Sequence, residues 1–121
     1  PIHLVVAATG ALHGEGAMEP EKTWRHMERR RLADAFEVNA ILPALIARAA
    51  LPRLARGAKD APEKAVFAAL SARVGSISDN RLGGWHAYRA SKAALNQIIK
   101  TCAIELARKA PHALCVGARV P

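Results

Sequence analysis

The amino-acid sequence predicts an α/β fold with a parallel sheet, because short apolar runs alternate along the chain with longer segments of helical periodicity. Three such runs are separated by two long helical segments, which is the order found in parallel βαβ units. The chain has 121 residues, and its hydrophobic fraction of 51% is enough for the core of one domain. No internal repeat or low-complexity tract interrupts this order.

The first half of the chain supplies a strand and a long helix. Residues 2–8 form a short β-branched apolar run, as expected for a buried parallel strand. A loop follows over residues 11–19, and a proline flanked by acidic residues predicts a helix start at 19–22. Apolar side chains then recur at helical spacing over residues 32–55, which predicts one long helix. Pro43 should bend it, because proline removes a backbone hydrogen bond and clashes with the preceding turn.

The second half repeats the pattern. Gly, Asp and Pro at residues 56–62 break the first helix, and the apolar run at 65–71 predicts a second buried strand. Residues 85–109 carry an apolar stripe at helical spacing, and Pro111 ends that helix. The run at 113–118 predicts the third strand.

The single tyrosine, Tyr88, is followed four positions later by Lys92. On a helix these side chains share a face, with Cβ atoms roughly 5–6 Å apart. Moving a phenol pKa from about 10 by roughly 2–3 units toward neutrality requires about 3–4 kcal/mol. One cation at about 4 Å supplies roughly 4 kcal/mol in an effective dielectric of about 20. The pair therefore predicts a proton-transfer phenol, and the alternative is a surface tyrosine beside a solvated lysine.

Four segments taken in order resemble a known protein family. They are Ala8-Thr9-Gly10 after the first strand, Val38-Asn39, the run ending in Ser71, and the motif from Tyr88 to Lys92. Together they are similar to the central and C-terminal part of a classical short-chain dehydrogenase/reductase core, closest to its C-factor-like branch. The resemblance implies a Rossmann-like, doubly wound parallel sheet, of which this chain holds three strands and the intervening helices.

The same resemblance predicts that residues 1–121 are a partial NAD(P)-binding domain. The family's glycine-rich turn receives the cofactor pyrophosphate at a helix N-terminus, and no such motif occurs in this sequence. The family's C-terminal substrate region is missing as well. A fragment of this extent is expected to be inactive alone.

The resemblance assigns roles to three residues of this chain. Tyr88 takes the role of the tyrosine that exchanges a proton with the substrate oxygen while a hydride passes between substrate and nicotinamide. Lys92 takes the role of the lysine that lowers the tyrosine pKa and binds the nicotinamide ribose. Asn39 matches an asparagine that opens its helix locally and continues a proton relay, and the alternative for it is a solvent-facing amide.

The family's catalytic serine position is occupied by Ala72. Ser71 aligns with the serine before it and is the favoured substitute, although a strand alternates its faces and Ser71 should point opposite to residue 72. Ser76 is the other candidate, and a site without this hydroxyl is the third possibility.

Ala8 and Gly10 align with the family's Asn-Ala-Gly segment beside the adenosine side of the cofactor, with alanine in place of the asparagine. The implied cofactor is NADP or NAD, and the residue that selects between them belongs to a strand that this sequence lacks. No metal is predicted, because His13 and His86 have no second ligand at metal-binding spacing.

The predicted function is an NAD(P)-dependent oxidoreductase that interconverts a small-molecule carbonyl and alcohol. The alternative is a non-catalytic signalling or scaffold protein with the same fold, supported by Ala72. A third possibility, a basic nucleic-acid-binding domain, rests on the net charge of +8. Because Glu28 and Asp34 lie among the arginines and few aromatics interleave them, we expect a solvated helix face and no nucleic acid.

Three expectations concern membrane insertion, cellular compartment and oligomeric state. No apolar run approaches about 18 residues, so no membrane span is expected. Cys102 and Cys115 lack metal-ligand spacing, which favours reduced thiols in a cytoplasmic protein. Both long helices carry more apolar residues than one sheet face can cover, which predicts a homodimer or homotetramer formed through them. The residues concerned are Ile41, Leu45, Leu51, Leu95, Ile99 and Ile104.

Overall fold

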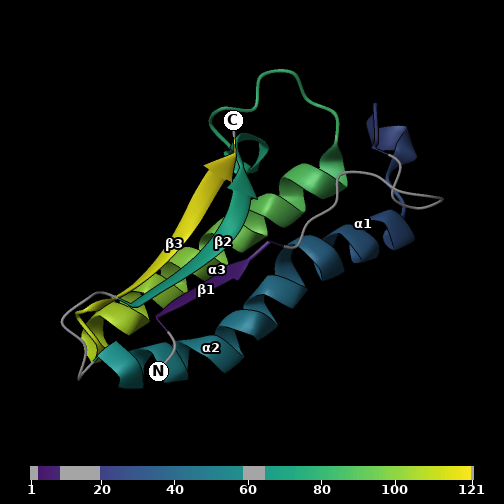
Figure 1. Cartoon of the computed structure of the whole chain (residues 1–121). Coiled ribbons are helices and arrows are strands. Elements are labelled where there is room, and N and C mark those ends of the chain that lie inside the picture. Colours follow the sequence, from purple (N-terminus) through teal and green to yellow (C-terminus); the bar gives the residue numbers. More distant parts are fainter. Residues whose placement is uncertain (1–2, 9–19, 59–64, 121) are drawn as a thin grey trace.

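A computed structural model of the chain describes residues 3–8, 20–58 and 65–120 (Figure 1). Its sheet has three strands, which are β1 (Leu4–Ala7), β2 (Ala65–Ala72) and β3 (Ala113–Val120). The strands are parallel and lie side by side in the order β1-β2-β3. The helices are α1 (Arg29–Phe36), α2 (Leu42–Ala58) and α3 (His86–Lys109). The predicted α/β fold with a Rossmann-like parallel sheet is confirmed.

The alternating burial of side chains along β2 shows which face of the sheet carries the helices. Its burial alternates strictly from Ala65 to Ala72, and the fully buried side chains include Phe67. These side chains form one core with residues of both long helices, among them Leu54 of α2 and Leu95 of α3. Both helices therefore pack on the same face of the sheet.

The opposite face of the sheet is open in the described part of the chain. Leu4 and Val6 of β1 are paired in register with Val66 and Ala68, and they are 63% and 51% exposed. Leu114 and Val116 of β3 lie on the same face and are exposed as well. Apolar strand residues of this kind are normally covered when parallel sheets carry helices on both faces.

The first long helix differs from its prediction in two respects. It begins at Arg29, and the helix start predicted at residues 19–22 is wrong, since this stretch is followed only by a 3-10 turn at Trp24–His26. It also contains a π-helical turn at Glu37–Ile41, where the Leu42 N–H reaches back five residues to the Glu37 carbonyl. Pro43 lies two residues after this turn, in the first turn of α2. The bend expected at Pro43 stays a prediction.

The helix from Arg29 to Ala55 is long and apolar enough, by length and composition, to cross a membrane. The core helices of other proteins pass the same test, so the expectation of no membrane span stays a prediction. Here Ala47, Ala50 and Leu54 of the helix are buried in the core shared with the sheet.

The second half of the chain follows its prediction closely. Helix α3 begins at His86, one residue after the predicted start, and ends at Lys109 as predicted. Trp85 precedes it in a left-handed conformation with φ of 56°. Strands β2 and β3 extend one and two residues beyond their predicted ends. Side-chain periodicity was sufficient here because both strands and the helix contribute to one core.

Gly75, in a 3-10 turn after β2, lies directly against α3. A Cβ atom at this position would come within 2.7 Å of the Asn96 Nδ2 and 3.0 Å of the Lys92 backbone carbon. We expect Gly75→Ala to lower the free energy of unfolding of the complete protein by about 1–3 kcal/mol, because a packed helix backbone cannot move aside cheaply. Urea unfolding measures this. Gly117→Ala is the control, since its nearest neighbour would lie 3.9 Å away, and equal stability losses in both variants would contradict the steric argument.

Candidate active site

Tyr88 and Lys92 lie in the first two turns of α3, beside the C-terminal end of β2. Lys92 is buried, with 3% of its surface exposed, and its Nζ donates a hydrogen bond of 3.0 Å to the Leu70 carbonyl. The same Nζ lies 5.9 Å from the centroid of the Tyr88 ring. The carboxyl ends of parallel strands are where ligands bind in open α/β sheets. Tyr88 and Lys92 therefore lie at the edge of the sheet where ligands bind in folds of this kind.

The electrostatics of this pair differ from the prediction. Burial raises the pKa of the Tyr88 phenol above its ordinary value. Burial also lowers the pKa of the Lys92 ammonium. Both directions follow because loss of hydration penalises the charged form of each group. The expected lowering of the Tyr88 pKa by Lys92 is therefore wrong for this structure, in which the ammonium binds a backbone carbonyl and the phenol stays protonated at neutral pH.

Asn39 lies inside the π-helical turn and is fully buried. Its Nδ2 donates to the Ser91 Oγ at 3.0 Å, and that hydroxyl in turn donates to the Tyr88 carbonyl at 2.9 Å. Asn39 is thus not a solvent-facing amide, and it lies where the helix is locally opened. Sequence reasoning missed the contribution of Ser91, although its position between Tyr88 and Lys92 could have indicated it. The proton relay assigned to Asn39 stays a prediction.

The two candidate serines lie in different surroundings. Ser71 is buried on the helix-covered face of β2, where its Oγ donates to the Asn96 Oδ1 of α3. Ser76 lies in the loop after β2, and its Oγ accepts a hydrogen bond from the Asp79 N–H at 3.3 Å. The Ser71 hydroxyl is already engaged with α3, while Ala72 alternates to the other face. Which hydroxyl serves the substrate, if either does, stays a prediction.

Of the predicted cofactor-binding residues outside α3, Ala8 is described and Gly10 is not. Ala8 is exposed immediately after β1. Gly10 and His13 lie outside the described residues. In the ranges that the structure does describe, no group of histidine, cysteine and acidic residues could hold a metal ion.

Neither cysteine is suited to nucleophilic chemistry. Both are free thiols. Burial, with a smaller contribution from Cys102, raises the pKa of Cys115 to about 11. Burial and the charge of Glu105 raise the pKa of Cys102 as well. Both side chains therefore remain protonated at neutral pH, and the thiolate is the reactive form.

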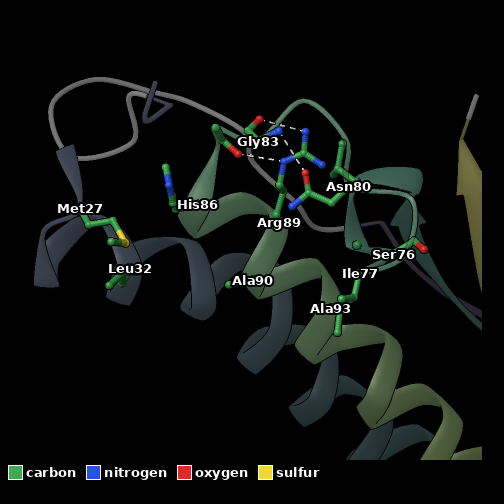
Figure 2. Close-up of a pocket in the computed structure, with 13 residues that line it drawn as sticks. Met27, Leu32, Ser76, Ile77, Asn80, Gly83, His86, Arg89, Ala90 and Ala93 are labelled. Atoms are coloured by element: carbon green, nitrogen blue, oxygen red, sulfur yellow. Dashed lines mark hydrogen bonds between the residues drawn. The ribbon is translucent and has the colours of Figure 1, made fainter. Parts of the chain in front are cut away.

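A cavity among the described residues lies elsewhere on α3. It has a volume of about 570 Å³ and is lined by Leu32 of α1, by Ile77 and by His86, Ala90 and Ala93 of α3 (Figure 2). Ser76, one of the two candidate serines, lines it, whereas Tyr88, Lys92 and Asn39 do not. The α3 residues in its wall recur at helical spacing on a different side of the helix from the core residues. The cavity is therefore not the place where a substrate would meet the Tyr88 phenol.

No protein-family model matches the chain. Over 75 residues it is 37% identical to C-signal of Myxococcus xanthus, an alignment that covers 62% of this chain and 42% of that protein. The carbonyl reductase Sniffer of D. melanogaster has a similar structure, with a TM-score of 0.76 and 28% identity over 93% of this chain and 45% of that one. The chain therefore spans less than half the length of these relatives.

A short-chain dehydrogenase/reductase from Burkholderia multivorans, solved with bound NADP, has the same fold. Its TM-score is 0.67 at 24% identity, and the match covers 97% of this chain and 43% of that one. At this identity the match speaks for the fold alone. The two preceding matches confirm the resemblance predicted from the motif at Tyr88 to Lys92.

Proposed function

We propose, on the premise that this chain has the sequence and fold of a central to C-terminal part of the short-chain dehydrogenase/reductase core, that the complete protein is an NAD(P)-dependent oxidoreductase. Its reaction would interconvert a carbonyl and an alcohol on a small molecule. The observation that carries this proposal is the buried Lys92 beside Tyr88 at the carboxyl end of β2. The likeness to a protein described as a carbonyl reductase supports it.

The residues present fit a nicotinamide cofactor. The Lys92 ammonium has three donors, and the bond to the Leu70 carbonyl uses one of them. The other two would be the donors to ribose hydroxyls, and Ala8 is exposed at the end of β1. When bound, NADP or NAD would supply or accept the hydride.

The chain's own contribution to the reaction is the proton. Because burial raises the pKa of Tyr88, its phenol holds a proton at neutral pH. In the direction of reduction the phenol O–H would donate to the carbonyl oxygen as hydride reaches the carbonyl carbon, giving the alcohol. The hydrogen bonds from Asn39 to Ser91 and from Ser91 to the Tyr88 carbonyl hold the backbone of this residue during the transfer.

Thermal unfolding tests the proposal. A ligand present at about 100 times its Kd stabilises the folded state by about 2.7 kcal/mol. NADPH or NADH should therefore raise the Tm of the complete protein, and short oligonucleotides at physiological salt should not. If nucleic acid stabilised the protein and neither cofactor did, the basic-domain alternative would replace the enzyme.

A non-catalytic signalling or scaffold protein is the second candidate. Ala72 at the family's serine position supports it, as does the 37% identity to a protein named C-signal. The two candidates differ in turnover rather than in cofactor binding. A complete protein that binds cofactor yet reduces no member of a broad set of aldehydes and ketones would favour the scaffold.

We also propose that the complete protein is a cytoplasmic homodimer or homotetramer formed through its long helices. Ile41 and Leu45 on the first of these helices and Ile104 on α3 are 43%, 52% and 44% exposed. Leu95 and Ile99, also expected on this surface, are instead buried in the core. The apolar excess of α3 is therefore smaller than predicted, and the surface lies mainly on α2 and the turn before it.

Sedimentation at micromolar concentration checks the assembly. The wild-type complete protein should sediment as a dimer or tetramer, and Leu45→Glu should shift it toward monomer because it places a charge in an apolar interface. Leu82→Glu is the control, since Leu82 is 94% exposed in the loop before α3. A wild-type protein that is monomeric under these conditions would contradict the proposal.

A further inference from the structure

Helix α3 has no capping side chain of its own at its N-terminus. The residue at the N-cap position is Trp85, whose indole makes no capping hydrogen bond. It is held in a left-handed backbone conformation, after two glycines that also have positive φ. The first N–H groups of a helix have no partner within the helix and need one from elsewhere. The start of the helix that carries Tyr88 must therefore be fixed by another part of the chain.

Glu21 provides these partners from 66 positions upstream. Its carboxylate Oε2 accepts a hydrogen bond of 3.1 Å from the Ala87 N–H. Its main-chain carbonyl accepts one of 2.6 Å from the Trp85 N–H. The side chain is almost completely buried, with 1% exposed. A carboxylate in this position is also favoured by the positive end of the helix dipole.

Ala87, whose N–H donates to the Glu21 carboxylate, is the immediate neighbour of Tyr88. On one side of Tyr88 the Ala87 N–H is bound by Glu21, and on the other side the Tyr88 carbonyl is bound by Ser91. The loop before the helix is secured separately by Arg89, which donates to the Gly84 carbonyl at 2.8 Å (Figure 2). Glu21 is thus the described side chain from outside α3 that fixes the backbone entering the tyrosine.

We propose that Glu21 is a positioning residue for Tyr88. Its carboxylate ties the segment before α1 to the first turn of α3 and so sets the place of the phenol relative to the substrate oxygen. This inference rests on the proposed proton-transfer role of Tyr88. A misplacement of about 1 Å can cost on the order of a hundredfold in rate, so the loss of a backbone anchor beside the reacting residue should be visible in kcat.

Three variants of the complete protein test the inference by steady-state kinetics. Glu21→Ala should lower kcat by about tenfold or more while the KM for cofactor stays within about twofold, because the phenol moves and the cofactor contacts do not. Glu21→Gln retains a carbonyl oxygen acceptor and should restore kcat to within about threefold of wild type. Glu28→Ala is the control, because its exposed carboxylate lies in the same segment, and it should leave kcat unchanged.

Hydrogen exchange of the Ala87 amide gives a readout that does not depend on activity. The amide should exchange faster in Glu21→Ala and at the wild-type rate in Glu21→Gln. The inference is overturned if Glu21→Ala changes neither exchange nor kcat, or if a folded Glu21→Gln is as slow as Glu21→Ala. If Tyr88→Phe retains turnover, the proposed function has failed, and the kinetic part of this inference falls with it.

Discussion

Replacing Tyr88 with phenylalanine should lower the kcat of the complete protein by about a thousandfold, the middle of the range for loss of a general acid or base. The change removes the hydroxyl and leaves the half-buried ring in place, so packing is preserved. Because burial raises the pKa of this phenol, the lost group is a protonated donor at neutral pH. Oxidation of NADPH or NADH with a panel of small aldehydes and ketones measures the effect.

Two further measurements separate the chemistry from folding. The Tm of Tyr88→Phe should remain close to that of wild type. Thr101→Ala removes an exposed hydroxyl from the middle of α3 and serves as the matched control, with turnover expected to be unchanged. Wild-type turnover in Tyr88→Phe would show that another group transfers the proton.

Replacing Lys92 with methionine should lower both turnover and cofactor affinity. Methionine retains much of the apolar stem that fills this buried position, whereas the ammonium and its hydrogen bonds are lost. Hydrogen bonds to a charged group contribute about 1.5–3 kcal/mol, so the Kd for cofactor should rise roughly tenfold to a hundredfold. Titration of NADPH fluorescence measures this Kd directly.

The stability of the same variant carries separate information. Burial lowers the pKa of Lys92, which means that the folded environment disfavours its charged form. Removing that charge should therefore offset part of the stability that is lost with the hydrogen bond to the Leu70 carbonyl. Lys100→Met, at an exposed position of α3, is the control. An unchanged Kd for cofactor in Lys92→Met would show that the assigned ribose contact is wrong.

Local patterns predicted the strands and α3 well because each of these elements contributes apolar side chains to one core. Phe67 of β2 and Leu106 of α3 illustrate this, since each is buried at the position its periodicity indicates. A helix start at residues 19–22 was predicted wrongly because Pro20 between acidic residues is typical of a helix N-terminus. The Glu21 carboxylate instead accepts a hydrogen bond from the Ala87 N–H at the start of α3. No local pattern reports a contact across 66 positions.

The candidate site likewise contains features that a local pattern predicts and features that depend on contacts between distant segments. The spacing of Tyr88 and Lys92 was enough to predict that they share a helix face. The direction of the Tyr88 pKa shift was not predictable, because it depends on burial and on the Leu70 carbonyl that takes up the ammonium. The participation of Ser91 likewise depends on Asn39, which reaches it only after the π-helical turn has packed against α3.

The π-helical turn at Glu37–Ile41 also limits how this chain can vary in length. Each residue of an α-helix turns the chain by about 100°. In the widened turn a hydrogen bond spans five residues instead of four, so the extra residue is absorbed and the helix on either side keeps the same face toward the core. Deleting one residue from this turn would restore a regular ladder and leave Ala47 and Leu54 facing the sheet, whereas a deletion in a regular turn would rotate them away by about 100°. Homologues with this packing should therefore concentrate single-residue gaps at residues 37–41, and such gaps in the regular turns between residues 29 and 54 would contradict this constraint.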